Sequence, residues 1–255
     1  SMNYGIYIHD GNANTVTIDS CYIANKTHGI YVLNDTAVVN STTVENCDYG
    51  VYADNGSNVT VNGGLLTDCT YGAYALGTSI LRLSGVNVYD NDYGVDSLGT
   101  AHVTVEDCCS IHGNIYGFYV DADSVVVANG NNIYDNSSYG VGWVGSYLPD
   151  FTENWWGDEL GPIMGSSSGG RDGIFFGNVL YSPWLDAPCD EGGAPVGASA
   201  RFAATPRSGA PGTKVQFTDR SVGASSECEI EEWLWNFGDG STSDEPNPSH
   251  VYMRE

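Results

Sequence analysis

The sequence has 255 residues, 41% of them hydrophobic, which is enough for one or two domains with a packed core. Only 8 lysines and arginines stand against 32 acidic residues, giving a formal net charge of −24. Such a surface repels phosphate backbones and anionic lipids, which argues against nucleic-acid and membrane-surface roles. No run of 18 apolar residues is present to insert into a bilayer.

A repeated Tyr-Gly motif with alternating residues after it runs through most of the chain. Its glycine recurs every 21 to 24 residues, at Gly5, Gly29, Gly50, Gly72, Gly94, Gly117 and Gly140. A period of this length indicates a repeat architecture, and every apolar segment in it has period two, without helical spacing. The pattern predicts an all-β fold: a parallel β-helix of about seven coils, each made of three short strands.

Three sets of apolar residues recur at the same place in each copy, so we expect them to stack inside the helix. The first set is Ile6, Ile30, Val51, Ala73, Val95, Phe118 and Val141. The second is Val16, Ala37, Val59, Leu81, Val103 and Val125, and the third is Ile23, Val44, Leu66, Val88, Ile111 and Ile133. A fourth set is polar and predicts an asparagine ladder between coils: Asn25, Cys47, Cys69, Asn91, Asn114 and Asn136.

Tyrosines recur on both sides of the glycine. The tyrosine two residues after it should point outward, at Tyr7, Tyr31, Tyr52, Tyr74 and Tyr119, with Asp96 and Gly142 interrupting the column. The tyrosine before it has inward parity and is expected at a corner, with His28 as the exception. The outward rings are candidates for glycan contact, although lateral packing between neighbouring strands is the preferred explanation for them.

The last part of the repeat region has a distinctive ending. It reads Glu-Asn-Trp-Trp-Gly at 153–157 and Pro-Trp-Leu at 183–185, and we expect Trp155, Trp156 and Trp184 to cap the open end of the stack over residues 151–186. With these motifs, residues 1–186 resemble right-handed parallel β-helix repeat proteins of the carbohydrate-binding and sugar-hydrolase type. The resemblance implies an archaeal (methanogen-like) or bacterial surface protein. No signal peptide precedes the first copy, so we expect a fragment of a longer chain.

A second module follows a small-residue segment, 187–200, that reads as a linker. Residues 201–255 contain Pro-Gly before Lys-Val-Gln-Phe-Thr-Asp, then Trp-Asn-Phe-Gly-Asp-Gly-Ser and Asn-Pro-Ser-His-Val-Tyr. These motifs resemble a PKD domain, which implies an immunoglobulin-like sandwich. The family pattern continues through two more strands, so the domain is expected to be incomplete at its C-terminal side, with its inner face uncovered.

Several residues are candidates for other chemistry. Asp96, Asp121 and Asp123 could form a carboxylate pair or a Ca²⁺ site, but solvated turn acids explain them as well; no other cofactor is predicted. A lyase acting on acidic polysaccharide is disfavoured because Lys26, Arg82 and Arg171 are the only lysines and arginines in residues 1–186. Cys47 and Cys69 are expected as stacked free thiols, and Cys189 could pair with Cys228. Glycosylation sequons lie at Asn25, Asn34, Asn40, Asn55, Asn58 and Asn136.

Taken together, the sequence predicts a non-catalytic, glycosylated, secreted or cell-surface protein. In this interpretation the β-helix is a rigid structural or adhesive module that contacts glycans or other surface proteins, with self-association as a further expectation. The alternative is a carbohydrate-active enzyme or carbohydrate-binding protein that uses the outer tyrosines and the Asp96, Asp121 and Asp123 carboxylates. Nucleic-acid binding and direct membrane insertion are not expected.

Overall fold

The computed structural model describes residues 3–9, 15–145, 147–168, 171–175, 179–196, 202–206, 208–219, 221 and 233–253. The chain divides into two compact units, residues 1–195 and 196–255. In the described ranges nearly all regular structure is β-strand, and the single helical element is a 3-10 turn, η1 (Cys189–Glu191). None of the described residues forms a helix long and apolar enough to cross a bilayer.

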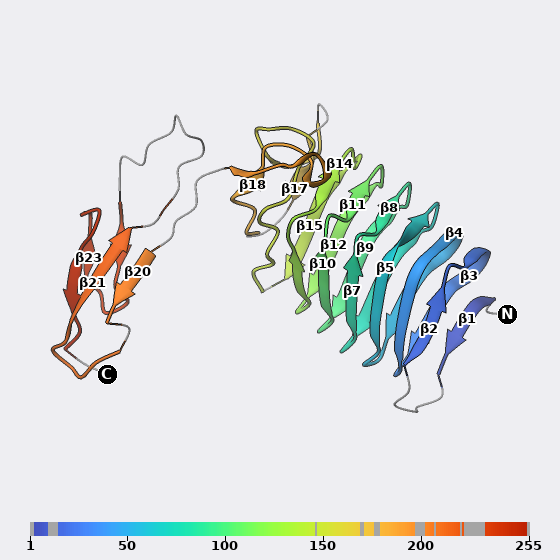
Figure 1. The fold of residues 1–255 in the computed structure, drawn as a ribbon, viewed down its shortest axis with the longest axis horizontal. Coiled ribbons are helices and arrows are strands. Elements are labelled where there is room, and N and C mark those ends of the chain that lie inside the picture. Colours follow the sequence, from blue (N-terminus) through green and yellow to red (C-terminus); the bar gives the residue numbers. More distant parts are fainter. Residues whose placement is uncertain are drawn as a thin grey trace. The chain divides into compact units, whose positions relative to one another are not determined.

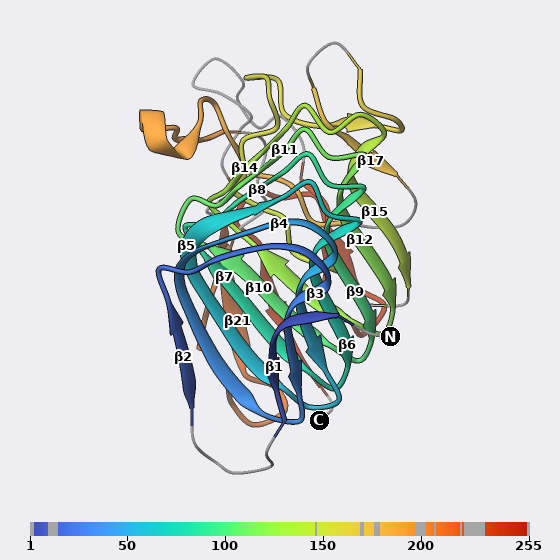
Figure 2. The ribbon, with the colours of Figure 1, turned by 90° about the vertical axis from the view of Figure 1, so that its right-hand side faces the viewer.

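The first unit is a stack of parallel coils with three faces (Figures 1 and 2). The Tyr-Gly face holds β1 (Tyr4–Ile8), the ends of β3 (Tyr22–Leu33) and β4 (Thr36–Asp54), β6 (Tyr71–Gly77), β9 (Tyr93–Gly99), β12 (Tyr116–Ala122), β15 (Tyr139–Gly145) and β17 (Gly173–Phe175). The second face holds β2 (Val16–Asp19), the starts of β4 and β5 (Asn58–Thr67), β7 (Ile80–Ser84), β10 (His102–Glu106) and β13 (Val125–Ala128). The third holds parts of β3, β4 and β5, then β8 (Asn87–Tyr89), β11 (Ser110–His112) and β14 (Asn132–Tyr134). The predicted parallel β-helix is confirmed.

Two of the three predicted apolar columns are confirmed residue for residue. Ile6 pairs with Ile30, and that column continues to Val141 and then to Ile174, while Ile23 starts the column that ends at Ile133. The second column is wrong at one position, because Val103 pairs with Val126 and not with Val125. Val126 keeps the nine-residue distance from its glycine that Val103 has, but the run Val125-Val126-Val127 hides the alternation.

The buried polar column is an amide ladder that runs in one direction. Asn91 Nδ2 donates to Asn114 Oδ1 (3.0 Å) and Asn114 Nδ2 donates to Asn136 Oδ1 (2.9 Å), and in each step the backbone N–H donates to the same oxygen. The ladder ends on Asp172, whose carboxylate accepts from the side chain and the backbone of Asn136. A carboxylate suits this end because it only accepts hydrogen bonds.

The N-terminal part of the predicted ladder needs one correction. Cys47 and Cys69 are free thiols, as predicted, and the backbone N–H of Cys69 donates to Asn91 Oδ1. Asn25, however, lies outside the column, because Lys26 is the residue in register with Cys47. Asn25 instead has a left-handed backbone (φ 60°) and accepts a hydrogen bond from Asn46 Nδ2 at 2.7 Å.

A second ladder, which the sequence did not indicate, lies at another corner of the later coils. The backbone N–H of Cys109 donates to Asn131 Oδ1 (3.0 Å), and Asn131 Nδ2 donates to Asn154 Oδ1 (3.2 Å). Asn154 Nδ2 then donates to the backbone oxygen of Ala128 at 2.7 Å. Buried amides with both hydrogen-bonding ends satisfied specify the register of adjacent coils.

The segment after β15 closes the end of the coil stack. Trp156 and Phe151 are fully buried, and Phe151 meets Phe118 edge to face with ring centroids 4.8 Å apart. Trp155 and Trp184 are half-buried, and Trp184 Nε1 donates to the backbone oxygen of Glu159. The backbone N–H of Phe151 donates to the oxygen of Leu180, and the N–H of Leu185 donates to the oxygen of Asn154. These hydrogen bonds pair backbone groups that the edge of the last coil would otherwise leave unpaired. Two short strand pairings complete the region. β16 (Ile163–Met164) pairs with β17, and β18 (Trp184–Leu185) pairs with β19 (Pro195–Val196).

A disulfide joins Cys108 to Cys189, with Cα atoms 5.8 Å apart. The prediction that Cys189 pairs with Cys228 is therefore wrong; Cys228 lies outside the described residues. Beside the disulfide, Asn132 accepts from the backbone of Cys189 and donates to Asp190. These contacts attach 188–191 to the coils, so the first nine residues of the predicted linker, 187–200, belong to the first unit.

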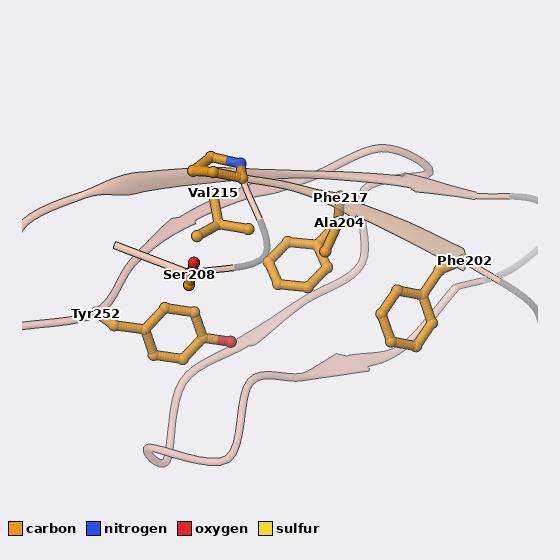
Figure 3. A pocket seen from close by; sticks show the side chains of 7 residues that line it. Phe202, Ala204, Ser208, Val215, Phe217 and Tyr252 are labelled. Atoms are coloured by element: carbon orange, nitrogen blue, oxygen red, sulfur yellow. The ribbon is translucent and has the colours of Figure 1, made fainter. Parts of the chain in front are cut away.

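The second unit contains a three-stranded antiparallel sheet in the order β20 (Phe202–Thr205), β21 (Lys214–Asp219) and β24 (Ser249–Val251). The hairpin of β22 (Trp235–Asn236) and β23 (Thr242–Ser243) encloses the predicted Asp239-Gly240 turn. This unit has a mostly apolar hollow of about 480 Å³, lined by Phe202, Ala204, Pro206, Ser208, Val215, Phe217 and Tyr252. Figure 3 shows the side chains that line it. Phe202 is 62% exposed and its ring contacts those of Phe217 and Trp235. The expected incompleteness of this domain stays a prediction.

Candidate functional site

Aromatic side chains gather in two adjacent columns on the Tyr-Gly face, which we call the aromatic wall. The first column is Tyr4, His28, Tyr49, Tyr71, Tyr93, Tyr116 and Tyr139; the second is Tyr7, Tyr31, Tyr52, Tyr74, Asp96, Tyr119, Gly142 and Phe175. Tyr7 is 46% exposed and the other tyrosines of both columns are half-buried. All five outward candidates therefore lie on one surface.

The sequence missed the role of the first column. Its tyrosines do not point inward, because Gly50 and Val51 are both buried in succession and the pleat alternation is broken at each glycine. Tyr49 and Tyr52 consequently share a side, with ring centroids 5.0 Å apart. An added side chain at the glycine would meet the backbone of the next coil; at Gly94 a Cβ would lie 2.6 Å from the oxygen of Gly117.

Most rings in the wall stack face to face along the coils. Tyr49 and Tyr71 are 4.9 Å apart with an interplanar angle of 8°, and Tyr4 and Tyr31 are 5.6 Å apart at 10°. Stacked faces are covered by their neighbours, so the outer surface of these rings consists mainly of edges and hydroxyl groups. This packing explains why the columns stabilise the coils, and it limits where a sugar ring could lie on an aromatic face.

The stacking order breaks around Asp96. The ring of Tyr74 is turned 71° from that of Tyr52, and the ring of Tyr119 is turned 80° from that of Tyr93 and 67° from that of Tyr116. Asp96 occupies the rung between Tyr74 and Tyr119, where the column lacks a ring. The ring column therefore has one rung without a ring, so that Tyr74 and Tyr119 are separated by two coil spacings, about 9.6 Å, with Asp96 between them. We call this ring-free rung the recess; Tyr93 precedes it on the same strand.

Asp96 has an unusual environment for a carboxylate. It is 8% exposed, and burial, together with the nearby charge of Asp121, raises its pKa to about 7, while the backbone N–H of Ser97 opposes that shift. Burial and then the Asp96 charge in turn raise the pKa of Tyr74 to about 12. No ion pair among the described residues includes Asp96, and Arg82 pairs with Glu106 of the adjacent coil.

We expect Asp96→Asn to change how stability depends on pH. The folded pKa of Asp96 is about 7 and the ordinary value for an aspartate is 3.8, so between those pH values the folded state holds a proton that the unfolded state has lost. Stability from this group is therefore lost as pH rises from about 4 to about 7. Relative to the wild type, Asp96→Asn should gain about 4 kcal/mol over that range, because the pKa difference is about three units and each unit corresponds to about 1.4 kcal/mol. Burial of the new amide shifts stability equally at every pH and does not affect this gain.

The measurement is urea unfolding of both proteins at pH 4, 5, 6, 7 and 8. Only the difference between the two curves is informative, because Asp172, whose pKa burial also raises to about 7, titrates in both proteins. Parallel curves would show that Asp96 is ionised normally in the folded protein.

The predicted Ca²⁺ site is not supported by the geometry. Asp96, Asp121 and Asp123 do not bring ligand atoms together in the structure. Among the described residues the one close group of metal-ligand types is Cys108, Cys189 and Asp190, in which both sulfurs are already in the disulfide. Asp121 lies two residues after Tyr119 on the same strand and acts on Asp96 through its charge alone.

The six sequons fall into different environments. Asn25, Asn34, Asn55 and Asn58 are exposed, and Asn40 is half-buried and accepts from Asn62 Nδ2. Asn136 is 1% exposed and its Nδ2 donates to Ile111 and Asp172 inside the ladder. A glycan on Asn136 is incompatible with this structure, because the modified nitrogen would be the one that holds two coils together.

Comparison with known proteins now decides the family. The model of the right handed beta helix region matches residues 4–155, more than half of the chain. The chain belongs to the right-handed β-helix family. The PKD domain model matches residues 197–255 of the second unit. The predicted archaeal or bacterial origin is not tested by these matches and stays a prediction.

A curated relative and the solved structures add little about activity. A 48-residue stretch of the β-helix–PKD chain is 50% identical to collagenase ColA of Bacillus cereus. That stretch covers 18% of this chain and 5% of the collagenase. No solved structure matches the chain. The two domain families indicate an extracellular surface or carbohydrate-related module.

Proposed function

We propose that this chain is a non-catalytic module of an extracellular cell-surface protein, in which the rigid β-helix presents the aromatic wall to glycans. The observation that carries the proposal is the break in ring stacking between Tyr74 and Tyr119. There two rings lie at steep angles to their neighbours, and we expect rings so turned to offer faces for sugar C–H groups to pack against. The net charge of −24 favours neutral or cationic ligands over acidic ones.

The rest of the wall supports a structural and adhesive role. Ring stacking in the first column ties neighbouring coils together, and the two amide ladders add to this in the later coils, so we expect the module to be stiff along its axis. A long, regular surface of this kind presents equivalent groups at each coil, which suits a repetitive ligand or a second surface protein. Self-association through the same wall is the competing use and would appear as a concentration-dependent mass in sedimentation velocity.

Glycan binding can be tested with a glycan array followed by NMR titration of the best ligand. We expect Tyr74→Ala and Tyr119→Ala each to weaken binding at least about tenfold, since loss of a buried aromatic contact has that magnitude. Tyr89→Ala is the matched control: Tyr89 belongs to a separate ring stack with His112 and Tyr134 on the third face. Equal effects of all three substitutions, or the absence of any glycan ligand, would contradict the proposal.

A carbohydrate-active enzyme is the second candidate, and Asp96 is the observation that favours it. A carboxyl group whose pKa lies near 7 in a recess can act as a general acid, with Asp121 as a second carboxylate on the same face. A reducing-sugar release assay over a panel of neutral polysaccharides decides between the two. Turnover that is lost in Asp96→Asn, Asp121→Asn or Asp123→Asn would establish the enzyme and overturn the non-catalytic assignment.

A further inference from the structure

The recess above Asp96 combines two kinds of group that cations seek. Its base is a carboxyl group in a nearly buried position, and its ends and one side are the phenol rings of Tyr74, Tyr119 and Tyr93. In-register residues of neighbouring parallel strands point to the same side, so the Asp96 side chain is directed outward between Tyr74 and Tyr119. The remaining 8% exposure means that solvent still reaches it.

Among the residues that the structure describes, no ion pair joins the carboxylate of Asp96 to a positive charge. The lysine and arginines described in the first unit are Lys26, Arg82 and Arg171; Lys26 is in register with Cys47, and the others pair with Glu106 and Asp158. The interaction that favours its charged form is the backbone N–H of Ser97, and Asp121 adds a repulsive charge. A buried anion without a partner is costly, so a ligand that brings a cation gains from pairing with it.

A metal ion is a poor occupant, because the neighbouring groups are rings and Asp121 and Asp123 do not complete a ligand set. An organic ammonium group fits better. It can pair with the carboxylate while its C–H and N–H groups lie against ring faces, and cation–π contact favours this arrangement over an exposed salt bridge. The two rings at the ends of the recess are the ones turned out of the stack.

We propose that the recess formed by Asp96, Tyr74, Tyr93 and Tyr119 binds the ammonium group of an amino sugar in a glycan that lies along the aromatic wall. This inference rests on the proposed function and specifies its ligand class. A glycan is favoured as the carrier because the wall continues for several coils on one side of the recess, so that the rest of an oligosaccharide meets further tyrosine edges and hydroxyls.

The test compares the glucosamine trimer with its N-acetylated counterpart by calorimetry at pH 7 and low salt, where a substantial share of both the sugar amines and the Asp96 carboxyl group is charged. The two ligands differ in charge but present similar sugar rings. We expect the glucosamine trimer to bind the wild type more tightly and to lose at least about tenfold in affinity with Asp96→Asn, since the ion pair is replaced by a neutral contact. The N-acetylated trimer should bind both proteins within about twofold.

Two controls keep the result specific. Asp19→Asn removes one exposed carboxylate from another face and alters the net charge equally, so it should leave both affinities unchanged within about twofold. Tetramethylammonium, added as a competitor, should displace the glucosamine trimer from the wild type but have little effect on Asp96→Asn. Circular dichroism and thermal unfolding of Asp96→Asn verify that the variant is folded.

The outcomes separate this inference from the proposed function. If both trimers bind and neither responds to Asp96→Asn, the wall binds glycans but the ammonium site is wrong. If neither trimer nor any other glycan binds, both proposals fail. If trilysine binds with the same affinity and the same dependence on Asp96, the assignment of the ammonium group to a sugar is overturned.

Discussion

Replacing Asn114 by alanine should destabilise the β-helix unit by about 3–5 kcal/mol. Asn114 is fully buried, its Oδ1 accepts from both the backbone and the side chain of Asn91, and its Nδ2 donates to Val88 and Asn136. Removal leaves several of these groups without partners in a region that water does not reach. Each such group costs about 1–3 kcal/mol, and a cavity adds to the cost.

Urea unfolding followed by circular dichroism measures this loss, and Asn62→Ala is the matched control. Asn62 Nδ2 also donates to an asparagine of the adjacent coil, Asn40 Oδ1 at 2.9 Å, but this pair is only partly buried. Water can replace that bond, so the control should cost less than about 1 kcal/mol. Similar losses for Asn114→Ala and Asn62→Ala would mean that the interior ladder does not hold the coils together.

Substitution of Gly94 by alanine should cost more than about 3 kcal/mol and should prevent the adjacent coils from packing at their native distance. A Cβ at this position would lie 2.6 Å from the backbone oxygen of Gly117 and 3.0 Å from Asn114 Nδ2. Neither neighbour can move freely, because one is backbone of the next coil and the other belongs to the amide ladder. Overpacking against rigid neighbours costs at least about 1–3 kcal/mol.

Gly142→Ala provides the control for the same strand face. A Cβ there would meet Tyr119 Cδ2 at 3.4 Å and the backbone oxygen of Phe118 at 3.7 Å, which are ordinary contacts. We expect a change in the free energy of unfolding within about 1 kcal/mol. Thermal unfolding of both variants gives the comparison, and a stable Gly94→Ala protein would show that coil spacing at the Tyr-Gly corner adapts to an added methyl group.

The local sequence pattern was sufficient to predict the stacked coils of the β-helix. The glycine spacing and the period-two alternation predicted a parallel β-helix, and they placed Ile30, Val51 and Ala73 in the column where the structure has them. The Cys47, Cys69, Asn91, Asn114 and Asn136 column was also predictable, because stacked coils put residues of equal offset above one another. The PKD motifs identified the second unit in the same way.

Features at bends and between distant segments were not predictable. A run of three valines gives no parity signal, so the sequence does not distinguish Val125 from Val126 as the inward residue. The side of Tyr49 does not follow from alternation either, because Gly50 interrupts the pleat. The Cys108–Cys189 disulfide joins residues 81 positions apart. Nothing in the cysteine spacing indicates that Cys189 pairs with Cys108 and not with Cys228. Asp172, the end of the ladder, lies outside the repeat pattern altogether.

The sequence by itself determined the repeat, the coil architecture and most residues of the candidate wall, because these depend on side-chain alternation and on equal offsets in successive coils. Only the tertiary structure decided that two tyrosine columns merge, that Tyr74 and Tyr119 turn out of the stack, and that Asp96 is nearly buried between them. Ring orientation and carboxylate burial depend on what the neighbouring coils place around each side chain. These neighbouring side chains come together only when the coils are stacked.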